Sequence, residues 1–152
     1  MQPSFIKNNF AKIILGSGSP RRKELLEKMG LDFNIHSLDI DESYPDSIPL
    51  NKIASYISQV KMKHLSGFYE KSCLLITADT VVRYKNEVLG KPLNQNESIQ
   101  MLKKLEGETH IVTTACSLKY REKEIVFSED TKVHFKHLND DLLSYYIQNY
   151  QA

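Results

Sequence analysis

Two carboxylates and several cations in this chain are the residue types that metal-assisted phosphate chemistry requires. Asp79 follows the apolar run Cys73–Ala78, and Glu42 lies in the acidic cluster Asp39–Glu42. Proteins bind Mg²⁺ through one or two carboxylates together with water and phosphate oxygens, and a carboxylate can also activate an attacking water. The basic residues available to neutralise a polyphosphate are Arg21, Arg22, Lys61 and Lys91.

A Gly/Ser loop leads from an apolar run into a basic helix start over residues 15–24. A helix start has unpaired backbone N–H groups and a partial positive charge, so it attracts phosphate. Ser17 and Ser19 add hydroxyl groups, and Gly16 and Gly18 are expected to let the backbone approach a ligand. The spacing excludes a dinucleotide loop and a P-loop. The alternative is an ordinary turn in which Ser19 caps the helix and the basic residues are solvated.

The other candidate residues also have structural interpretations, which stay open at this point. Acidic loops such as Asp41-Glu42 are usually solvated, and Lys61 has the spacing of a lysine that lies along a helix surface. Asp79 either caps the end of an apolar strand or points into a cleft. The five histidines show no zinc-ligand spacing.

Length and charge limit the class of protein. The chain has 152 residues, enough for one domain with a core, and 20 Lys and Arg residues against 19 Asp and Glu residues give a net charge of +1. We therefore expect no nucleic-acid or membrane partner, and any anion site must be local. Cys73 and Cys116 lie in apolar runs, and no signal peptide or spanning stretch is evident, so we expect a cytoplasmic protein.

Hydrophobic periodicity predicts the elements that must position these residues. The expected strands are residues 12–15, 33–38, 73–78, 81–84, 87–89, 110–120 and 124–135. The expected helices are residues 20–29, 50–64, 94–105 and 139–147. Strands separated by helices and followed by a hairpin of long strands predict an α/β fold with a mixed central sheet and flanking helices.

In their order along the chain, these residues resemble the Maf family of nucleotide pyrophosphatases. The resemblance covers nearly the whole chain, and several motifs in one order are hard to explain by chance. The matching residues are Leu15–Arg22, Asp39–Ser43, Lys61, Ala78–Val82, Gly90-Lys91-Pro92, Leu105 with Gly107 and His110, and Thr131–Val133.

The resemblance implies an inosine-triphosphatase-like fold with two lobes around a cleft, in an expected homodimer. It implies house-cleaning hydrolysis of a nucleoside triphosphate to the monophosphate and pyrophosphate with Mg²⁺ or Mn²⁺. Within the resemblance, the double Arg at Arg21 and Arg22 together with Thr80 favours the branch that acts on dTTP and UTP. The implied catalytic residues are Asp79, Lys61, Lys91 and Glu42, the implied metal ligands are Glu42 and Asp79, and the implied substrate-binding residues are Ser17, Ser19, Arg21, Arg22 and Thr80.

The chain departs from the family pattern at Met62, Glu106 and Glu108, where Ala, Ser and Arg are usual. Members also continue past a helix like residues 142–147, so we expect one Maf-like domain, residues 1–152, that lacks the family's C-terminal segment. The alternative function is a truncated nucleotide- or partner-binding protein with little turnover. A sugar-nucleotide transferase would share the loop but would need a sugar-binding half.

Overall fold

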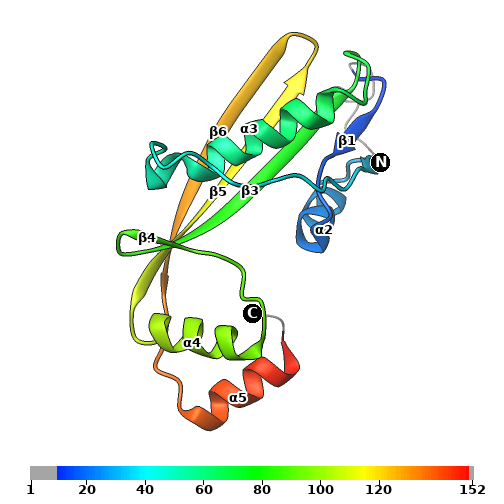
Figure 1. The fold of residues 1–152 in the computed structure, drawn as a ribbon. Coiled ribbons are helices and arrows are strands. Elements are labelled where there is room, and N and C mark those ends of the chain that lie inside the picture. The colour runs from blue at the N-terminus through cyan, green and yellow to red at the C-terminus, as the bar shows by residue number, and fades with distance from the viewer. Residues whose placement is uncertain (1–9, 151–152) are drawn as a thin grey trace. The chain divides into compact units, whose positions relative to one another are not determined.

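The computed structural model describes residues 10–150 and contains a mixed sheet with flanking helices (Figure 1). The strand order is β2-β1-β3-β5-β6, with β4 paired to β3. The expected α/β class and mixed sheet are confirmed. The elements are β1 Ile13–Leu15, α2 Pro20–Lys28, β2 Asn34–Ile35, the 3-10 helix η1 Leu50–Lys52, α3 Ile53–Ser66, β3 Leu74–Tyr84, β4 Glu87–Leu89, α4 Gln95–Leu105, β5 Thr109–Tyr120, β6 Lys123–His134 and α5 Asp140–Asn149.

The chain divides into two compact units, and β3, β5 and β6 each contribute to both. The first unit consists of residues 1–80 and 114–129, and the second of residues 81–113 and 130–152. In the second unit β4 pairs antiparallel with the end of β3, as the sequence predicts, and α4 packs against α5 (Figure 1). Asn94 and Asn139 cap these two helices by accepting from Glu97 N and Leu142 N.

Parallel pairing in the first unit brings the Gly/Ser loop beside the middle of β3. β1 is parallel to both β2 and β3, and Leu15 is in register with Ile76. The pairing continues one residue further, because Gly16 N donates to Ile76 O at 2.8 Å. Ser17 therefore leaves β1 next to the segment of β3 that leads to Asp79.

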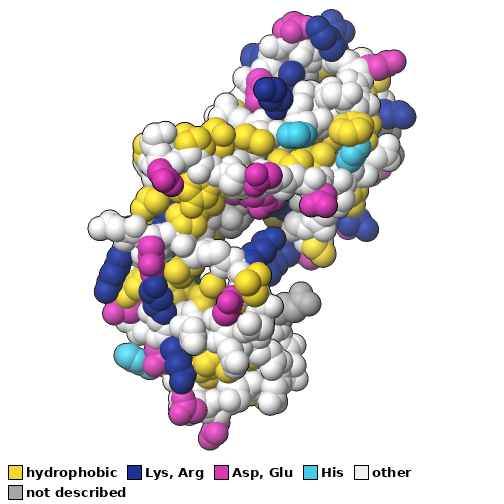
Figure 2. Space-filling view, in the orientation of Figure 1, with side chains coloured by type: hydrophobic (Ala, Val, Ile, Leu, Met, Phe, Trp, Pro, Cys, Tyr) yellow, Lys and Arg dark blue, Asp and Glu magenta, His cyan; other side chains and the backbone are white. Residues whose placement is uncertain are grey.

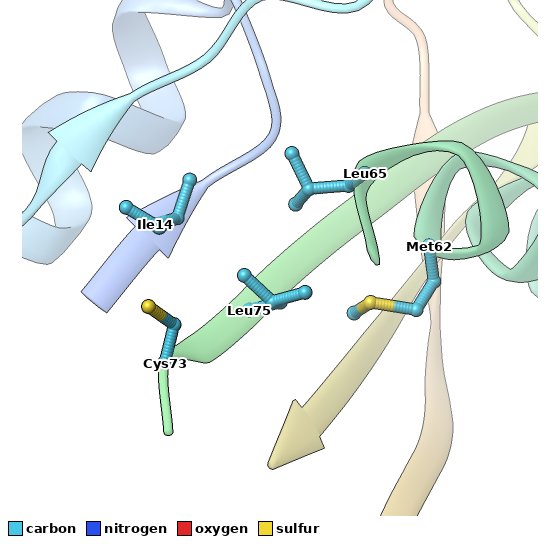
Figure 3. Close-up of a cluster of buried hydrophobic side chains, with 5 residues drawn as sticks. All are labelled: Ile14, Met62, Leu65, Cys73 and Leu75. Atoms are coloured by element: carbon cyan, nitrogen blue, oxygen red, sulfur yellow. The ribbon is translucent and has the colours of Figure 1, made fainter. Parts of the chain in front are cut away.

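Alternating residues of β1 fix helices on both faces of this sheet. Ile14 and Leu75 pack with Met62 and Leu65 of α3, and Cys73 completes the cluster (Figure 3). On the opposite face Ile13, Leu15 and Ile76 pack under Leu26 of α2. Successive residues of a strand point to opposite faces of the sheet, so the short strand β1 contributes core residues to both faces and packs against both α2 and α3.

Two expected strands have different bounds in the structure. The expectation that an apolar strand ends before Asp79 is wrong, because β3 is continuous from Leu74 to Tyr84 and Asp79 lies in its middle. Thr80, Val81 and Val82 are residues that favour strands, and pairing with β4 supports this half. The expected strand at residues 33–38 is only Asn34–Ile35, because it lies at the edge of the sheet and its one partner, β1, has three residues.

The helices and the charged surface bear on the expected absence of membrane and nucleic-acid partners. None of the helices in residues 10–150 has the length and hydropathy needed to cross a membrane. On the face drawn in Figure 2, basic and acidic side chains are interspersed, so this face has no continuous basic surface.

Gly16 is required by packing, a role in addition to the expected approach of the backbone to a ligand. A Cβ at this position would lie 2.8 Å from Leu65 Cδ2 and 3.0 Å from Thr77 Cγ2. We predict that Gly16→Ala lowers the free energy of unfolding by about 1–3 kcal/mol, because these core side chains must shift. Urea denaturation measures the change.

Gly90→Ala is the matched control, because a Cβ there has no atom within 4 Å. Its unfolding free energy should stay within about 0.5 kcal/mol of the wild-type value. Equal stability of Gly16→Ala and Gly90→Ala would show that the packing around Gly16 is looser than the structure indicates.

Candidate active site

Lys61 lies at the centre of a buried group of charges in the first unit. Its Nζ lies 3.1 Å from Asp79 Oδ1 and 3.0 Å from Glu42 Oε1, and it donates to Ala78 O at 3.3 Å. An ammonium has three N–H donors, and hydrogen bonds to Asp79 and Ala78 use two of them, beside the ion pair with Glu42. Lys61 and Asp79 are only 8% and 6% exposed. The sequence interpretation of Lys61 as a lysine on a helix surface is therefore wrong.

The helix and strand periods explain why these two residues meet. Lys61 belongs to the buried face of α3, together with Ser58 and Leu65. Thr77 and Asp79 are two residues apart in β3, so both side chains point to the face that α3 covers. Thr77 Oγ1 donates to Ser58 O at 2.7 Å, one helical turn before Lys61 meets Asp79.

Burial of the Asp79 carboxyl and the positive charges beside it shift its pKa in opposite directions. Desolvation raises the pKa of Asp79 above its ordinary value, and Lys61 beside it lowers that pKa by Coulomb attraction and a hydrogen bond. Glu42 raises the pKa of Asp79 further, and Arg22 lowers it, but desolvation prevails. A carboxylate with a raised pKa is a stronger base than an exposed aspartate, which suits it to accept a proton from water.

Arg22 forms a second polar group on the opposite face of β3. Its Nη1 donates to Ser17 Oγ at 3.2 Å and to Ala78 O at 3.0 Å, and its Nη2 donates to Thr80 Oγ1 at 3.2 Å. Thr80 Oγ1 is also 3.0 Å from Thr114 Oγ1 of β5. A guanidinium has five N–H donors, so two of them stay available for a phosphate.

The Gly/Ser loop takes the expected strand–loop–helix form, and its serines bond within the loop. Ser17 Oγ accepts from Ser19 N at 3.2 Å, and Ser19 Oγ accepts from Arg22 N at 3.5 Å. Ser19 thus caps α2, as the structural interpretation predicts. Arg21 is exposed at the start of the helix.

The carbonyl of Ala78 joins the two polar groups, and sequence reasoning missed it. It accepts from Lys61 on one face of the sheet and from Arg22 on the other. No side-chain pattern could identify a backbone acceptor. Thr114 was missed as well, because its contact with Thr80 depends on the pairing of β5 with β3.

The remaining candidates have different surroundings. Lys91 is exposed after β4 and belongs to the second unit. Burial raises the pKa of the Cys116 thiol, and nearby Arg22 offsets this only in part, so this cysteine is a poor nucleophile. Glu42, whose side chain is half exposed, and Asp79 are the two carboxylates beside Lys61.

Comparisons with known proteins show which family the chain resembles. The chain matches the Maf-like protein family over residues 12–152. Proteins named dTTP/UTP pyrophosphatase from Bacteroides fragilis and Porphyromonas gingivalis are each 40% identical to it, over 92% of this chain and 73% and 72% of their own lengths. The solved structure of the Staphylococcus aureus Ham1 protein aligns with a TM-score of 0.51 at 14% identity, over 81% of this chain and 71% of that one, which indicates a shared fold.

The raised pKa of Asp79 predicts a particular dependence of stability on pH. A carboxyl with a raised pKa in the folded state favours the fold when protonated, so its contribution is lost as the pH rises through that pKa. We predict that the stability of wild type relative to Asp79→Asn falls between the ordinary pKa of 3.8 and neutral pH. Urea denaturation of both proteins at several pH values measures the difference.

Asp41→Asn is the control with the opposite sign. The Ser43 N–H donates to Asp41 and lowers the pKa of that carboxyl, so the contribution of Asp41 is lost as the pH falls. A pH-independent difference between wild type and Asp79→Asn would contradict the burial of the Asp79 charge.

Proposed function

Because this chain belongs to the Maf-like protein family, we propose that it hydrolyses nucleoside triphosphates, dTTP and UTP first among them, to the monophosphate and pyrophosphate. The observation that carries the proposal is the buried contact of Lys61 with Asp79, beside Glu42. The alternative, a binding protein with little turnover, is not favoured by the relatives named as pyrophosphatases.

In the proposed reaction, water attacks the α-phosphorus and the bond between the α-phosphorus and the bridging oxygen breaks. Asp79 accepts the proton of the attacking water, and pyrophosphate leaves with the bridging oxygen. Lys61 holds the Asp79 carboxylate in place through the 3.1 Å contact and adds positive charge beside the reacting phosphate. The raised pKa of Asp79 strengthens it as a base near neutral pH.

Two groups in the first unit are suited to bind the phosphates. Arg22 has two N–H donors beyond those it gives to Ser17, Ala78 and Thr80. Arg21 is exposed beside it, and a guanidinium binds phosphate oxygens as a planar fork. Ser17 and Ser19 remain proposed substrate-binding residues, and Lys91 remains a proposed catalytic residue of the second unit.

A divalent metal ion generally accompanies this reaction, and we propose Mg²⁺ or Mn²⁺. Residues 10–150 contain no group of three or more His, Cys, Asp or Glu side chains able to hold a metal ion. Two carboxylates beside one ammonium fit an ion that takes its other ligands from water and substrate. Glu42 and Asp79 would hold this ion, and Asp79, which has two carboxylate oxygens, would keep one of them to accept the proton. When bound, the ion supplies charge neutralisation for the triphosphate. The expected cytoplasmic location and homodimer stay predictions.

Pyrophosphate release from a panel of nucleoside triphosphates, with Mg²⁺ or Mn²⁺, tests the proposed function. We expect turnover of dTTP and UTP by wild type, and a loss of about 10²–10⁴-fold in kcat for Asp79→Asn, because the amide cannot accept the proton. Nucleotide affinity should stay within about tenfold, since the shape of the side chain is kept.

Glu122→Gln is the matched control, because Glu122 is an exposed acid paired with Lys71 in the same unit. Its kcat should equal that of wild type. A wild-type protein that binds dTTP without releasing pyrophosphate would favour the binding-protein alternative, and full turnover by Asp79→Asn would remove Asp79 from the mechanism.

Thr80 is proposed to contribute to the choice of pyrimidine nucleotides through its bonds with Arg22 and Thr114. We predict that Thr80→Gln reduces kcat/KM for dTTP and UTP about tenfold more than for GTP, because the larger amide displaces this network. Thr80→Ser keeps the hydroxyl and should keep the wild-type preference. An equal loss for all nucleotides would mean that Thr80 does not affect selectivity.

A further inference from the structure

Three hydroxyl side chains lie fully buried between α3 and the sheet, outside the residues assigned above. Ser58, Thr77 and Ser117 are each 0% exposed. Burying a hydroxyl is unfavourable unless it is hydrogen-bonded, whereas an apolar side chain such as valine fills the volume of threonine without that requirement. These three buried hydroxyls are therefore expected to have hydrogen-bond partners and a role that apolar side chains could not fill.

These hydroxyls form one connected set of hydrogen bonds across three elements. Thr77 Oγ1 of β3 donates to Ser58 O of α3 at 2.7 Å. Ser58 Oγ donates to Ser55 O and lies 2.9 Å from Ser117 Oγ of β5. Because Ser58 has one O–H donor, Ser117 is the donor in that second contact. The set thus ties α3 to both neighbouring strands.

The Thr77 bond specifies how far α3 is shifted along β3. Apolar packing alone tolerates small shifts of a helix over a sheet, but a 2.7 Å hydrogen bond to one carbonyl does not. Lys61 follows Ser58 by three residues on α3, and Asp79 follows Thr77 by two on β3. The same register that joins Thr77 to Ser58 therefore sets the 3.1 Å distance between Lys61 Nζ and Asp79 Oδ1.

The methyl group of Thr77 packs on a third element. A Cβ built on Gly16 would lie 3.0 Å from Thr77 Cγ2, so this methyl lies against the backbone that leads to Ser17. Thr77 thus contacts α3 through its hydroxyl and the loop after β1 through its methyl. Valine would remove only the first contact, and serine only the second.

We infer that Thr77 is a positioning residue whose hydroxyl, supported by Ser58 and Ser117, fixes the register of α3 on β3 and so places Lys61 on Asp79. The inference rests on the proposed function for its consequence in turnover, but the geometry it describes exists without substrate. Thr77 touches neither substrate nor reacting atoms and acts through Lys61.

The test compares Thr77→Val with Thr77→Ser in dTTP hydrolysis. Thr77→Val should lower kcat about 10- to 100-fold with KM within about threefold, because a misplaced catalytic pair loses rate and not substrate binding. Thr77→Ser should keep kcat within about threefold, since the hydroxyl stays. Ser117→Ala is the second variant, should Thr77→Val fail to fold, and is expected to lower kcat by about threefold or more.

Thr113→Val controls for the loss of a buried hydroxyl as such. Thr113 is 1% exposed, and its Oγ1 donates to Asp130 at 2.6 Å and accepts from Arg83 Nε and Nη2 at 3.3 and 3.2 Å, so none of these hydrogen-bond partners belongs to α3. Its kcat should stay within about threefold of wild type even if its stability falls. Wild-type kcat in folded Thr77→Val or Ser117→Ala, or equal losses in Thr77→Val and Thr113→Val, would overturn the inference.

A substrate-free readout separates this inference from the proposed function. The NMR signal of the Lys61 ammonium should be protected from solvent exchange in wild type, Thr77→Ser and Thr113→Val, and exposed to exchange in Thr77→Val. Absence of turnover in wild type would contradict the proposed function alone. An unchanged Lys61 signal in Thr77→Val would overturn the positioning role alone.

Discussion

A buried ammonium can persist only where acceptors replace its lost water, and this requirement organises the first unit. Lys61 is 8% exposed, and its partners are one buried carboxylate, one carbonyl and the half-exposed Glu42. Removing one partner of a buried ion pair typically costs about 3–5 kcal/mol, whereas the pair itself adds little net stability. The pair therefore restricts the structure more than it stabilises it, because α3 and β3 must keep the alignment that satisfies both charges.

One backbone carbonyl links the buried Lys61 to the polar group on the other face of the sheet. Ala78 O accepts from Lys61 and from Arg22, so the backbone beside Asp79 is held from both sides. Arg22 in turn holds Ser17 and Thr80. A rigid backbone at this point lets Asp79 keep one position despite the unfavourable burial of its charge, and catalysis benefits from groups placed before substrate arrives. The proposed function thus depends on the same few hydrogen bonds that restrict α3, β3 and the loop after β1.

Local features of the fold and site were predictable from the sequence, and those set by tertiary register were not. Asn94 and Asn139 cap helices that begin at the expected positions, and Ser19 caps α2 as its alternative interpretation predicts, because a cap depends on neighbouring residues alone. The family resemblance identified Lys61 and Asp79 as site residues. Their contact, however, depends on how α3 lies on β3, and no sequence spacing encodes it.

Other differences between expectation and structure have the same origin. The continuation of β3 through Asp79 could not be predicted. A carboxylate in an apolar run indicates the end of a strand, unless it is known that a lysine from another element pairs with it. The packing role of Gly16 could not be predicted, because Leu65 and Thr77, which crowd it, are distant in sequence. The burial of Lys61, which the sequence left open between a helix-surface lysine and a site residue, could not be predicted for the same reason.

Whether Lys61 and Asp79 act as one unit can be measured by a double-mutant cycle on kcat for dTTP hydrolysis. The cycle compares Lys61→Met, Asp79→Asn and the double variant with wild type. If the two side chains act only together, the double variant should lose no more than about the larger single loss. Losses that multiply in the double variant would contradict the account, because they would mean that each residue contributes independently.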